Sequence, residues 1–287
     1  MVEIRNLSFA YARKRLFTNL DLLLEPGNIY GLLGKNGAGK TTLLKIICGL
    51  RFPQRGECRV LGHLSSLRPA ALLEDIFLLP EELYIPPLTP QLYTSLYGPF
   101  YRRFDHSVLK SCLKEFELEP AANLSELSFG QKKKFLIAFG LATGSRLLLL
   151  DEPTNGLDIP SKSQFRRLMA RAGAEGRVVL ISTHQVRDME QLIDPIIILD
   201  DGQVIFQQSM AEIGRRLAMT LEPEPPAAGT ALHSEKTLGG FVTVRENRSG
   251  EDSRMDIEVL FNAVTGNREQ IRELFAGQPS GFGRREV

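Results

Sequence analysis

Continuous apolar runs alternate with polar and amphipathic segments over most of the chain. The runs at 28–33, 146–150, 178–182 and 196–199 are apolar at nearly every position. Such runs predict parallel strands that are covered on both faces of a sheet. Between two of them, 161–171 has the pattern of a crossover helix. The alternation therefore predicts an α/β fold with a doubly wound parallel sheet.

Two further regions frame this predicted sheet. Residues 2–33 have the pattern of short strands with turns, among them 2–7 and 20–24, and 50–62 that of a turn and a strand. From about 82 to 140 the pattern becomes helical and rich in aromatic side chains. We expect a strand-rich N-terminal part and a separate helical part beside the sheet.

A proline-rich run at 222–229 breaks all periodicity, which is typical of a linker. We therefore expect one large domain over 1–221, a linker over 222–230 and a small extension over 231–287.

Within the expected extension, 240–245 and 255–261 alternate like paired strands, and 268–275 has the pattern of a short helix. Residues 277–287 have the composition of a disordered tail. The pattern predicts a small α+β unit without indicating its role.

Composition narrows the class of protein. The chain has 287 residues, 43% of them hydrophobic and 24% charged, with a formal net charge of +1. With a net charge so close to zero, the protein has no overall positive electrostatic field that would attract nucleic acid. The three cysteines lack metal-ligand or paired spacing, and no apolar run approaches the ~20 residues that span a membrane. We therefore expect a soluble, cytoplasmic protein that binds no nucleic acid.

Residues 34–42 form a complete phosphate loop of the pattern G-x-x-x-x-G-K-[ST]. The loop lies between a predicted strand and a predicted helix, where backbone N–H groups and the helix N-terminus can surround phosphate oxygens. Lys40 is placed to reach the β- and γ-phosphates, and the Thr41 hydroxyl to ligate Mg²⁺. The predicted nucleotide-binding residues of this segment are Asn36, Gly37, Ala38, Gly39, Lys40, Thr41 and Thr42.

Two acids end a buried strand at Asp151 and Glu152, where a metal ligand and a base belong in an open α/β sheet. We expect Asp151 to hold Mg²⁺ and Glu152 to polarise the attacking water. His184 follows another buried strand and could donate a hydrogen bond to the γ-phosphate or to that water. A strand followed by a helix cap and a turn is the structural alternative for the two acids.

A second helix start with polar and small residues lies upstream, at 127–134. Ser128 supplies a hydroxyl and Gly130 permits close approach, so the helix N-terminus could bind a phosphate. A plain N-capped helix with a basic surface explains the same residues.

Taken in order, these segments resemble the ATP-binding cassette (ABC) family. The phosphate loop, the signature motif at 127–131, the acid-ended strand, the D-loop at 155–158 and a switch histidine at His184 occur in the family's order over about residues 1–215. The resemblance implies a P-loop NTPase cassette with a RecA-like parallel-sheet core, an N-terminal antiparallel β-subdomain, a helical subdomain at about 82–140 and a small α+β C-terminal extension. It also places Tyr11, with Phe9 as the alternative, against the adenine ring.

The resemblance further implies that ATP is bound between two cassettes. Lys40, Thr41, Asp151, Glu152 and His184 then come from one subunit, and Ser128 and Gly130 from the other. Asp158 would lie at the interface between the two sites. A single cassette predicts a homodimer or a pair with a similar subunit.

Two positions depart from the family pattern. Phe129 stands in the signature where the commonest version has glycine, while Gly130 is kept. Glu81 follows Pro80 where the Q-loop usually has glutamine, so we count Glu81 as a further candidate Mg²⁺ ligand. Gln91, after Pro90, is the competing candidate for that position.

The resemblance favours the ATPase subunit of a transporter, exporter-like, that acts on a separate polytopic membrane permease at the inner face of the cell membrane. Its helical part would receive the cytoplasmic segment of that permease. A soluble ABC protein that acts on ribosomes or DNA, and a regulatory ABC pair, are the alternatives.

Overall fold

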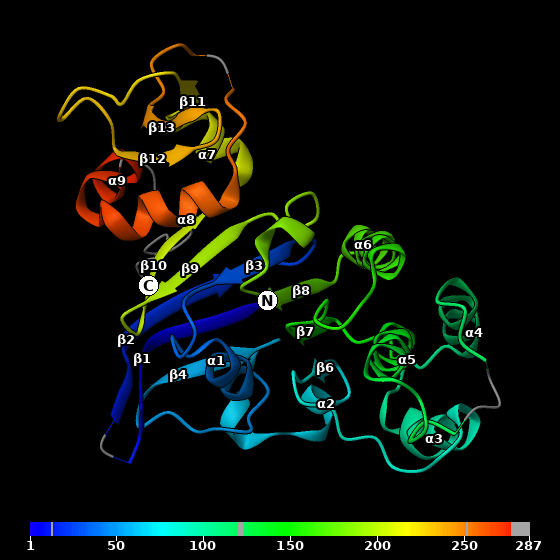
Figure 1. The fold of residues 1–287 in the computed structure, drawn as a ribbon. Coiled ribbons are helices and arrows are strands. Elements are labelled where there is room, and N and C mark those ends of the chain that lie inside the picture. Colours follow the sequence, from blue (N-terminus) through cyan, green and yellow to red (C-terminus); the bar gives the residue numbers. More distant parts are fainter. Residues whose placement is uncertain (13, 120–122, 251, 277–287) are drawn as a thin grey trace.

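The computed structural model describes residues 1–12, 14–119, 123–250 and 252–276. In this part of the chain, strands form a four-stranded, a six-stranded and a three-stranded sheet, and the helices surround the largest of them (Figure 1). The largest sheet positions the candidate site.

The central sheet has the strand order β10-β9-β3-β8-β7-β6. The five strands from β9 to β6 are parallel to one another, and β10 pairs antiparallel with β9 at the edge. This arrangement confirms the predicted parallel α/β core. The strands are β3 (Ile29–Leu33), β6 (Ile76–Leu79), β7 (Leu147–Asp151), β8 (Val178–Ser182), β9 (Ile196–Asp200) and β10 (Gln203–Gln208).

An antiparallel sheet of order β2-β1-β4-β5 covers one face of the central sheet, together with α1 (Lys40–Ile47) (Figure 1). The other face is covered by α5 (Phe129–Ala142) and α6 (Ile159–Ala174). The antiparallel strands are β1 (Val2–Tyr11), β2 (Lys14–Leu24), β4 (Arg55–Val60) and β5 (His63–Leu64).

Each apolar run serves both layers because neighbouring side chains of a strand point to opposite faces. In β7, Leu147 and Leu149 belong to the core shared with the N-terminal sheet, whereas Leu148 and Leu150 belong to the core shared with α5 and α6. The strand therefore tolerates no polar side chain before its end, where Asp151 stands.

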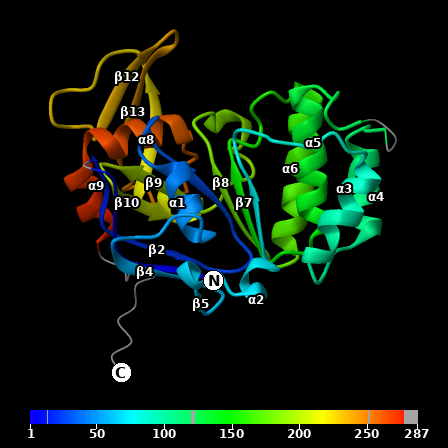
Figure 2. The same cartoon turned by 90° about the horizontal axis from the view of Figure 1, so that it is seen from below.

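The helical subdomain lies beside the central sheet (Figure 2), and β6 is the edge strand on that side (Figure 1). A break at Gly98–Phe100, a short 3-10 helix, divides its aromatic segment. Its helices are α3 (Pro90–Tyr97), α4 (His106–Glu115) and the first part of α5; the single-turn α2 (Ala70–Leu73) precedes β6.

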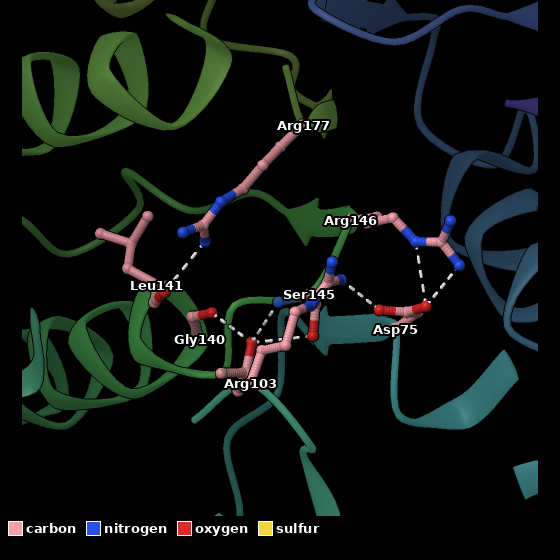
Figure 3. Close-up of polar contacts among 8 residues, drawn as sticks. Asp75, Arg103, Gly140, Leu141, Ser145, Arg146 and Arg177 are labelled. Atoms are coloured by element: carbon pink, nitrogen blue, oxygen red, sulfur yellow. Dashed lines mark hydrogen bonds and ion pairs between the residues drawn. The ribbon is translucent and has the colours of Figure 1, made fainter. Parts of the chain in front are cut away.

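An ion-pair cluster ties this subdomain to the sheet (Figure 3). Asp75, directly before β6, accepts from Arg103 of the helical part and from Arg146 directly before β7, whose Nε lies 2.9 Å from Asp75 Oδ2. One carboxylate thus joins two strand starts and the helical subdomain.

The C-terminal part forms a three-stranded antiparallel sheet of order β11-β13-β12. In Figure 1, α8 lies between this sheet and β9 and β10 of the central sheet. The strands are β11 (Leu217–Glu222), β12 (His233–Thr237) and β13 (Gly240–Glu246), and the helices are α7 (Met210–Arg216), α8 (Ile257–Gly266) and α9 (Arg268–Phe275).

The expected strand at 255–261 is wrong, because this segment begins α8. Asp256 caps the helix by accepting from the N–H groups of Glu258 and Val259. Buried Ile257, Leu260 and Val264 follow a helical spacing that the shorter alternating stretch concealed. The predicted β13 and α9 are present.

The expected linker differs from the structure at its start. β11 ends at Glu222 and pairs with β13, so the proline-rich run connects two strands of one sheet. The third sheet therefore begins at Leu217, inside the range expected for the large domain. The predicted disordered tail at 277–287 lies outside the described residues.

We expect Asp75→Ala to lower the free energy of unfolding by about 1–2 kcal/mol, because it removes charge-assisted bonds from two arginines at once. Denaturant unfolding measures the change. Glu57→Ala is the matched control, since Glu57 pairs with Arg59 two residues away on the same strand; we expect a change below about 0.5 kcal/mol. Equal effects of the two variants would contradict the prediction.

Candidate active site

A cavity of about 510 Å³ lies at the carboxyl ends of the central strands. The phosphate loop follows β3, the acid pair ends β7, His184 follows β8 and Glu81 follows β6. Because these strands are parallel, their ends meet at one edge of the sheet. The lining residues are Tyr11, Lys14, Leu16, Asn36, Gly37, Gly39, Lys40, Thr41, Thr42, Glu81, Asp151, Glu152 and His184.

The phosphate loop leaves the N-terminus of α1 open. Gly39, the residue before the helix, has φ +106°, and an added Cβ would lie 2.7 Å from the Phe17 ring, so only glycine fits. The N-cap residue Gly39 has no side chain that could cap α1, so the first N–H groups of the helix remain available for an anion. Ala38, also expected in the site, packs against the N-terminal core.

Lys40 is buried at the floor of the cavity. Its Nζ donates to the carbonyl of Gly34, at 2.7 Å. Burial lowers the pKa of Lys40, while the carboxylates of Glu152, Asp151 and Glu81 oppose that shift. The ammonium thus faces three acids across the space where phosphates are expected.

Thr41 and Asp151 meet although they are 110 residues apart in the chain. The Thr41 hydroxyl donates to Asp151 Oδ2 at 2.6 Å, and the Ser182 hydroxyl donates to Oδ1. The start of α1 is thereby joined to the ends of β7 and β8 by one buried carboxylate.

Glu152 is buried, and its carboxylate is held from two sides. Oε1 lies 2.6 Å from Nδ1 of His184, and Oε2 accepts from the Thr183 hydroxyl at 3.2 Å. The backbone of Glu152 has φ +47°, an uncommon conformation for a residue with a side chain. Such local strain is found where surrounding contacts fix a side chain for chemistry.

Tyr11 lines the cavity and Phe9 does not. Tyr11 is 44% exposed, whereas Phe9 is 5% exposed and packs edge-to-face against the Tyr11 ring. The Tyr11 hydroxyl lies 3.3 Å from Thr42 Oγ1, and this hydrogen bond lowers the pKa of Tyr11. Of the two candidates for the aromatic contact, Tyr11 is therefore the one whose ring is accessible from the cavity.

The geometry likewise separates the two Q-loop candidates. Glu81 lies two residues after the end of β6 and lines the cavity. Gln91 lies in α3 and borders a different hollow, between α3 and α4.

Ser128, Gly130 and Asp158 do not line the cavity of their own chain. Ser128 caps α5 in a reciprocal capping box with Gln131. Gly130 packs so closely on the D-loop that an added Cβ would lie 2.6 Å from the Gly156 carbonyl oxygen. Asp158 caps α6 by accepting from the Ser161 N–H at 2.9 Å, and Ser161 lowers the pKa of Asp158.

Three site residues were missed from the sequence. Ser182 and Thr183 precede His184 and bond to the two acids, a role that their place at a strand end could have indicated. Lys133 was included in an expected basic helix surface, yet it is fully buried and donates to the carbonyl of Glu152 at 2.8 Å. Lys133 lies four residues before the apolar Ile137, a spacing that places both on the same face of a helix, and this spacing could have indicated that Lys133 is buried.

Comparison with known proteins agrees with these observations. A family model described as ABC transporter matches residues 17–155. The uncharacterized ABC transporter ATP-binding protein YcbN of Bacillus subtilis is 30% identical, over 86% of this chain and 82% of its own length. The Nod factor export ATP-binding protein I of Burkholderia lata is 28% identical, over 78% of this chain and 77% of its own length.

The arabinose import ATP-binding protein AraG of Chromohalobacter salexigens is 28% identical over 88% of this chain, which spans only 55% of that relative. Among solved structures, an ATP-binding subunit of an ABC transporter superposes with a TM-score of 0.69 at 26% identity, over 75% of this chain and 92% of its own. No helix among the described residues is both long and apolar enough to cross a membrane.

The ordered motifs, their convergence on one cavity and these similarities show that the chain belongs to the ABC transporter ATP-binding proteins, the ATPase subunits of ABC transporters.

Proposed function

We propose that this chain hydrolyses ATP at the cavity described above, as one half of a cassette pair that drives a separate membrane permease. The observation that carries the proposal is the meeting of Lys40, Thr41, Asp151, Glu152 and His184 in one cavity at a sheet edge. The residues come from three separate places, the start of α1, the end of β7 and the segment after β8, so a single structural cap or turn does not explain the set.

The phosphates are held by the loop amides, the open N-terminus of α1 and the Lys40 ammonium. The Thr41 hydroxyl and the Asp151 carboxylate fit Mg²⁺, which prefers one or two carboxylates with phosphate and water oxygens as the remaining ligands. When bound, Mg²⁺ would neutralise charge that develops on the phosphate oxygens. The Tyr11 ring would stack on adenine, a contact worth ~1–3 kcal/mol for bases elsewhere.

Glu152 is the general base. Its carboxylate lies within the cavity, and the bonds from His184 and Thr183 fix its direction, so it can accept a proton from a water that attacks the γ-phosphate. His184 lies within hydrogen-bond distance of the Glu152 carboxylate, lines the same cavity and has a side chain that is 42% exposed. It would steady both Glu152 and the γ-phosphate.

A second copy of the chain would complete the site. Ser128 and Gly130 open α5 away from their own cavity, and the side chain of Phe129 beside them is 47% exposed. Association in a two-fold pair would bring this helix start to the phosphates of the partner, with Asp158 at the interface. Loss of the γ-phosphate would weaken the pair and let it open.

A groove of about 570 Å³ in the helical subdomain is the proposed docking site for the permease. Tyr84 and Phe100 border it and are 87% and 70% exposed, which is unusual for large aromatic side chains. Pro80 lines the groove and its neighbour Glu81 lines the nucleotide cavity. A partner helix in the groove would contact Pro80, and a shift of Pro80 would move Glu81 in the nucleotide cavity. The two adjacent residues would in this way couple the permease to the bound nucleotide.

We further propose that the transport is export and takes place from the inner face of the cell membrane. The exporter-like motif pattern and the similarity to a Nod factor export protein support this direction. Similarity to an arabinose import protein makes the direction a point for experiment.

Glu152→Gln is expected to lower the ATP turnover rate by about 10²–10⁴-fold while ATP binding persists, because the general base is lost but the phosphate ligands remain. Steady-state ATPase assays and nucleotide titration measure the two quantities. Glu224→Gln, at an exposed position of the proline-rich run, is the control and should retain full activity. Wild-type turnover in Glu152→Gln would refute the assignment.

Glu81→Ala is expected to raise the Mg²⁺ concentration for half-maximal ATPase several-fold, with a smaller effect on ATP affinity, because a cavity carboxylate is removed. The measurement is a Mg²⁺ titration of ATPase activity. Gln91→Ala should leave that titration unchanged, since Gln91 lies outside the cavity. An unchanged titration for Glu81→Ala would exclude a role in Mg²⁺ binding.

Affinity purification of the Glu152→Gln chain from its native cells should recover a polytopic membrane protein in equal amounts, identified by mass spectrometry. Introducing a charge in the groove with Phe100→Glu should abolish that recovery without affecting ATP binding. Ribosomal or DNA-repair proteins in its place would overturn the transporter assignment and leave the ATPase intact.

A further inference from the structure

Lys133 is an unusual lysine. It lies on the second turn of α5 and is fully buried, although charged side chains are rarely so unless they are paired. Its Nζ donates to the carbonyl oxygen of Glu152, 19 residues along the chain, at 2.8 Å. The bond joins the helix that begins at the signature motif to the backbone of the proposed general base.

Several hydrogen bonds fix the backbone of Glu152, and the bond from Lys133 to its carbonyl oxygen is one of them. The Glu152 N–H donates to Ser182 O at 3.0 Å, and the Asn155 N–H donates weakly to Glu152 O at 3.3 Å. Because φ of Glu152 is +47°, the backbone at this point needs such contacts to hold its uncommon conformation. Of the donors to the Glu152 carbonyl, Lys133 makes the shorter and charge-assisted bond.

Phe129 connects the same lysine to the exposed end of α5. The Lys133 Nζ lies 4.9 Å from the centre of the Phe129 ring. The ring also covers the D-loop glycine so closely that a Cβ on Gly156 would lie 2.7 Å from it. One side of Phe129 thus contacts the lysine and the D-loop, and 47% of the residue remains exposed.

The charges around Lys133 are consistent with a retained ammonium. Burial lowers the pKa of Lys133 to about 8, and the carboxylates of Glu81, Glu152 and Asp151 oppose that shift. At neutral pH the side chain therefore remains mostly protonated in a place where a lysine is costly. A neutral side chain could fill the volume, so packing alone does not account for the lysine.

We propose that Lys133 is a positioning residue for Glu152, and that Phe129 transmits contact at the exposed start of α5 through Lys133 to this base. The inference rests on the proposed function, in which the start of α5 meets the nucleotide of a second copy. Binding at the partner's site would then tighten Phe129 over Lys133 and set Glu152 in its own site. The two ATP sites of a pair would be coupled within each subunit.

The test compares Lys133→Met, which keeps the length of the chain but removes the donor, with Lys133→Gln, which keeps a donor. We expect kcat to fall at least tenfold in Lys133→Met, with the Kd for ATP within about twofold of wild type. Lys133→Gln should recover a large part of kcat. A merely structural role would instead lower thermal stability and weaken ATP binding together with kcat.

Lys132→Met is the matched control. Lys132 is the neighbour of Lys133 on the helix and is partly exposed, so this variant should keep kcat within twofold of wild type. Glu152→Gln separates this inference from the proposed function: an active Glu152→Gln would overturn both. An inactive Glu152→Gln beside a fully active Lys133→Met would overturn the role of Lys133 alone.

A double-mutant cycle provides the second test if Lys133→Met does not fold. Phe129→Ala, Lys133→Leu, which is a second variant without the donor, and the combined variant are compared by kcat and by the Hill coefficient for ATP. If Phe129 acts through Lys133, the combined loss is smaller than the product of the single losses, and the Hill coefficient falls toward one. Independent, multiplicative losses with an unchanged Hill coefficient would overturn the coupling.

Discussion

Burial of the central strands on both faces is the constraint on which the rest of this molecule depends. Strands β3, β7 and β8 have apolar side chains at almost every position because one face packs against α1 and the N-terminal sheet and the other against α5 and α6. Polar side chains can appear only where the strands end. Since the strands run in parallel, their ends collect the phosphate loop, Asp151, Glu152 and His184 at one edge.

This constraint explains why so much could be predicted from the sequence. The phosphate loop and the acid pair are local patterns at strand ends, and the parallel order of the strands brings them together without further information. The choice between Tyr11 and Phe9, in contrast, needed the structure: Phe9 is buried and packs against the Tyr11 ring, whereas Tyr11 is partly exposed and lines the cavity.

Features that depend on long-range packing could not be predicted in the same way. The Lys132-Lys133-Lys134 run resembles a solvated surface, and only the docking of α5 against β7 and the D-loop buries the middle lysine. The segment from Ile257 to Phe261 carries both an alternating and a helical set of apolar residues, and the Asp256 cap with the longer helical set through Val264 decides for a helix. The strand partner of β11, β13, lies beyond the proline-rich run; its own strand pattern is visible in the sequence, but no local pattern indicates that the two strands pair.

The third sheet begins at Leu217, before the proline-rich run, and this limits where the C-terminal extension can be separated from the cassette. A cut at the proline-rich run would leave β11 attached to the cassette without β13, its pairing partner, and so present a row of unpaired backbone groups to solvent. It would also remove Phe275, whose ring packs on Phe206 of the central sheet. The extension therefore cannot be removed or exchanged as a separate unit by cutting the chain at the proline-rich run. Exchanging it between relatives would require a junction before Leu217, in the region of α7.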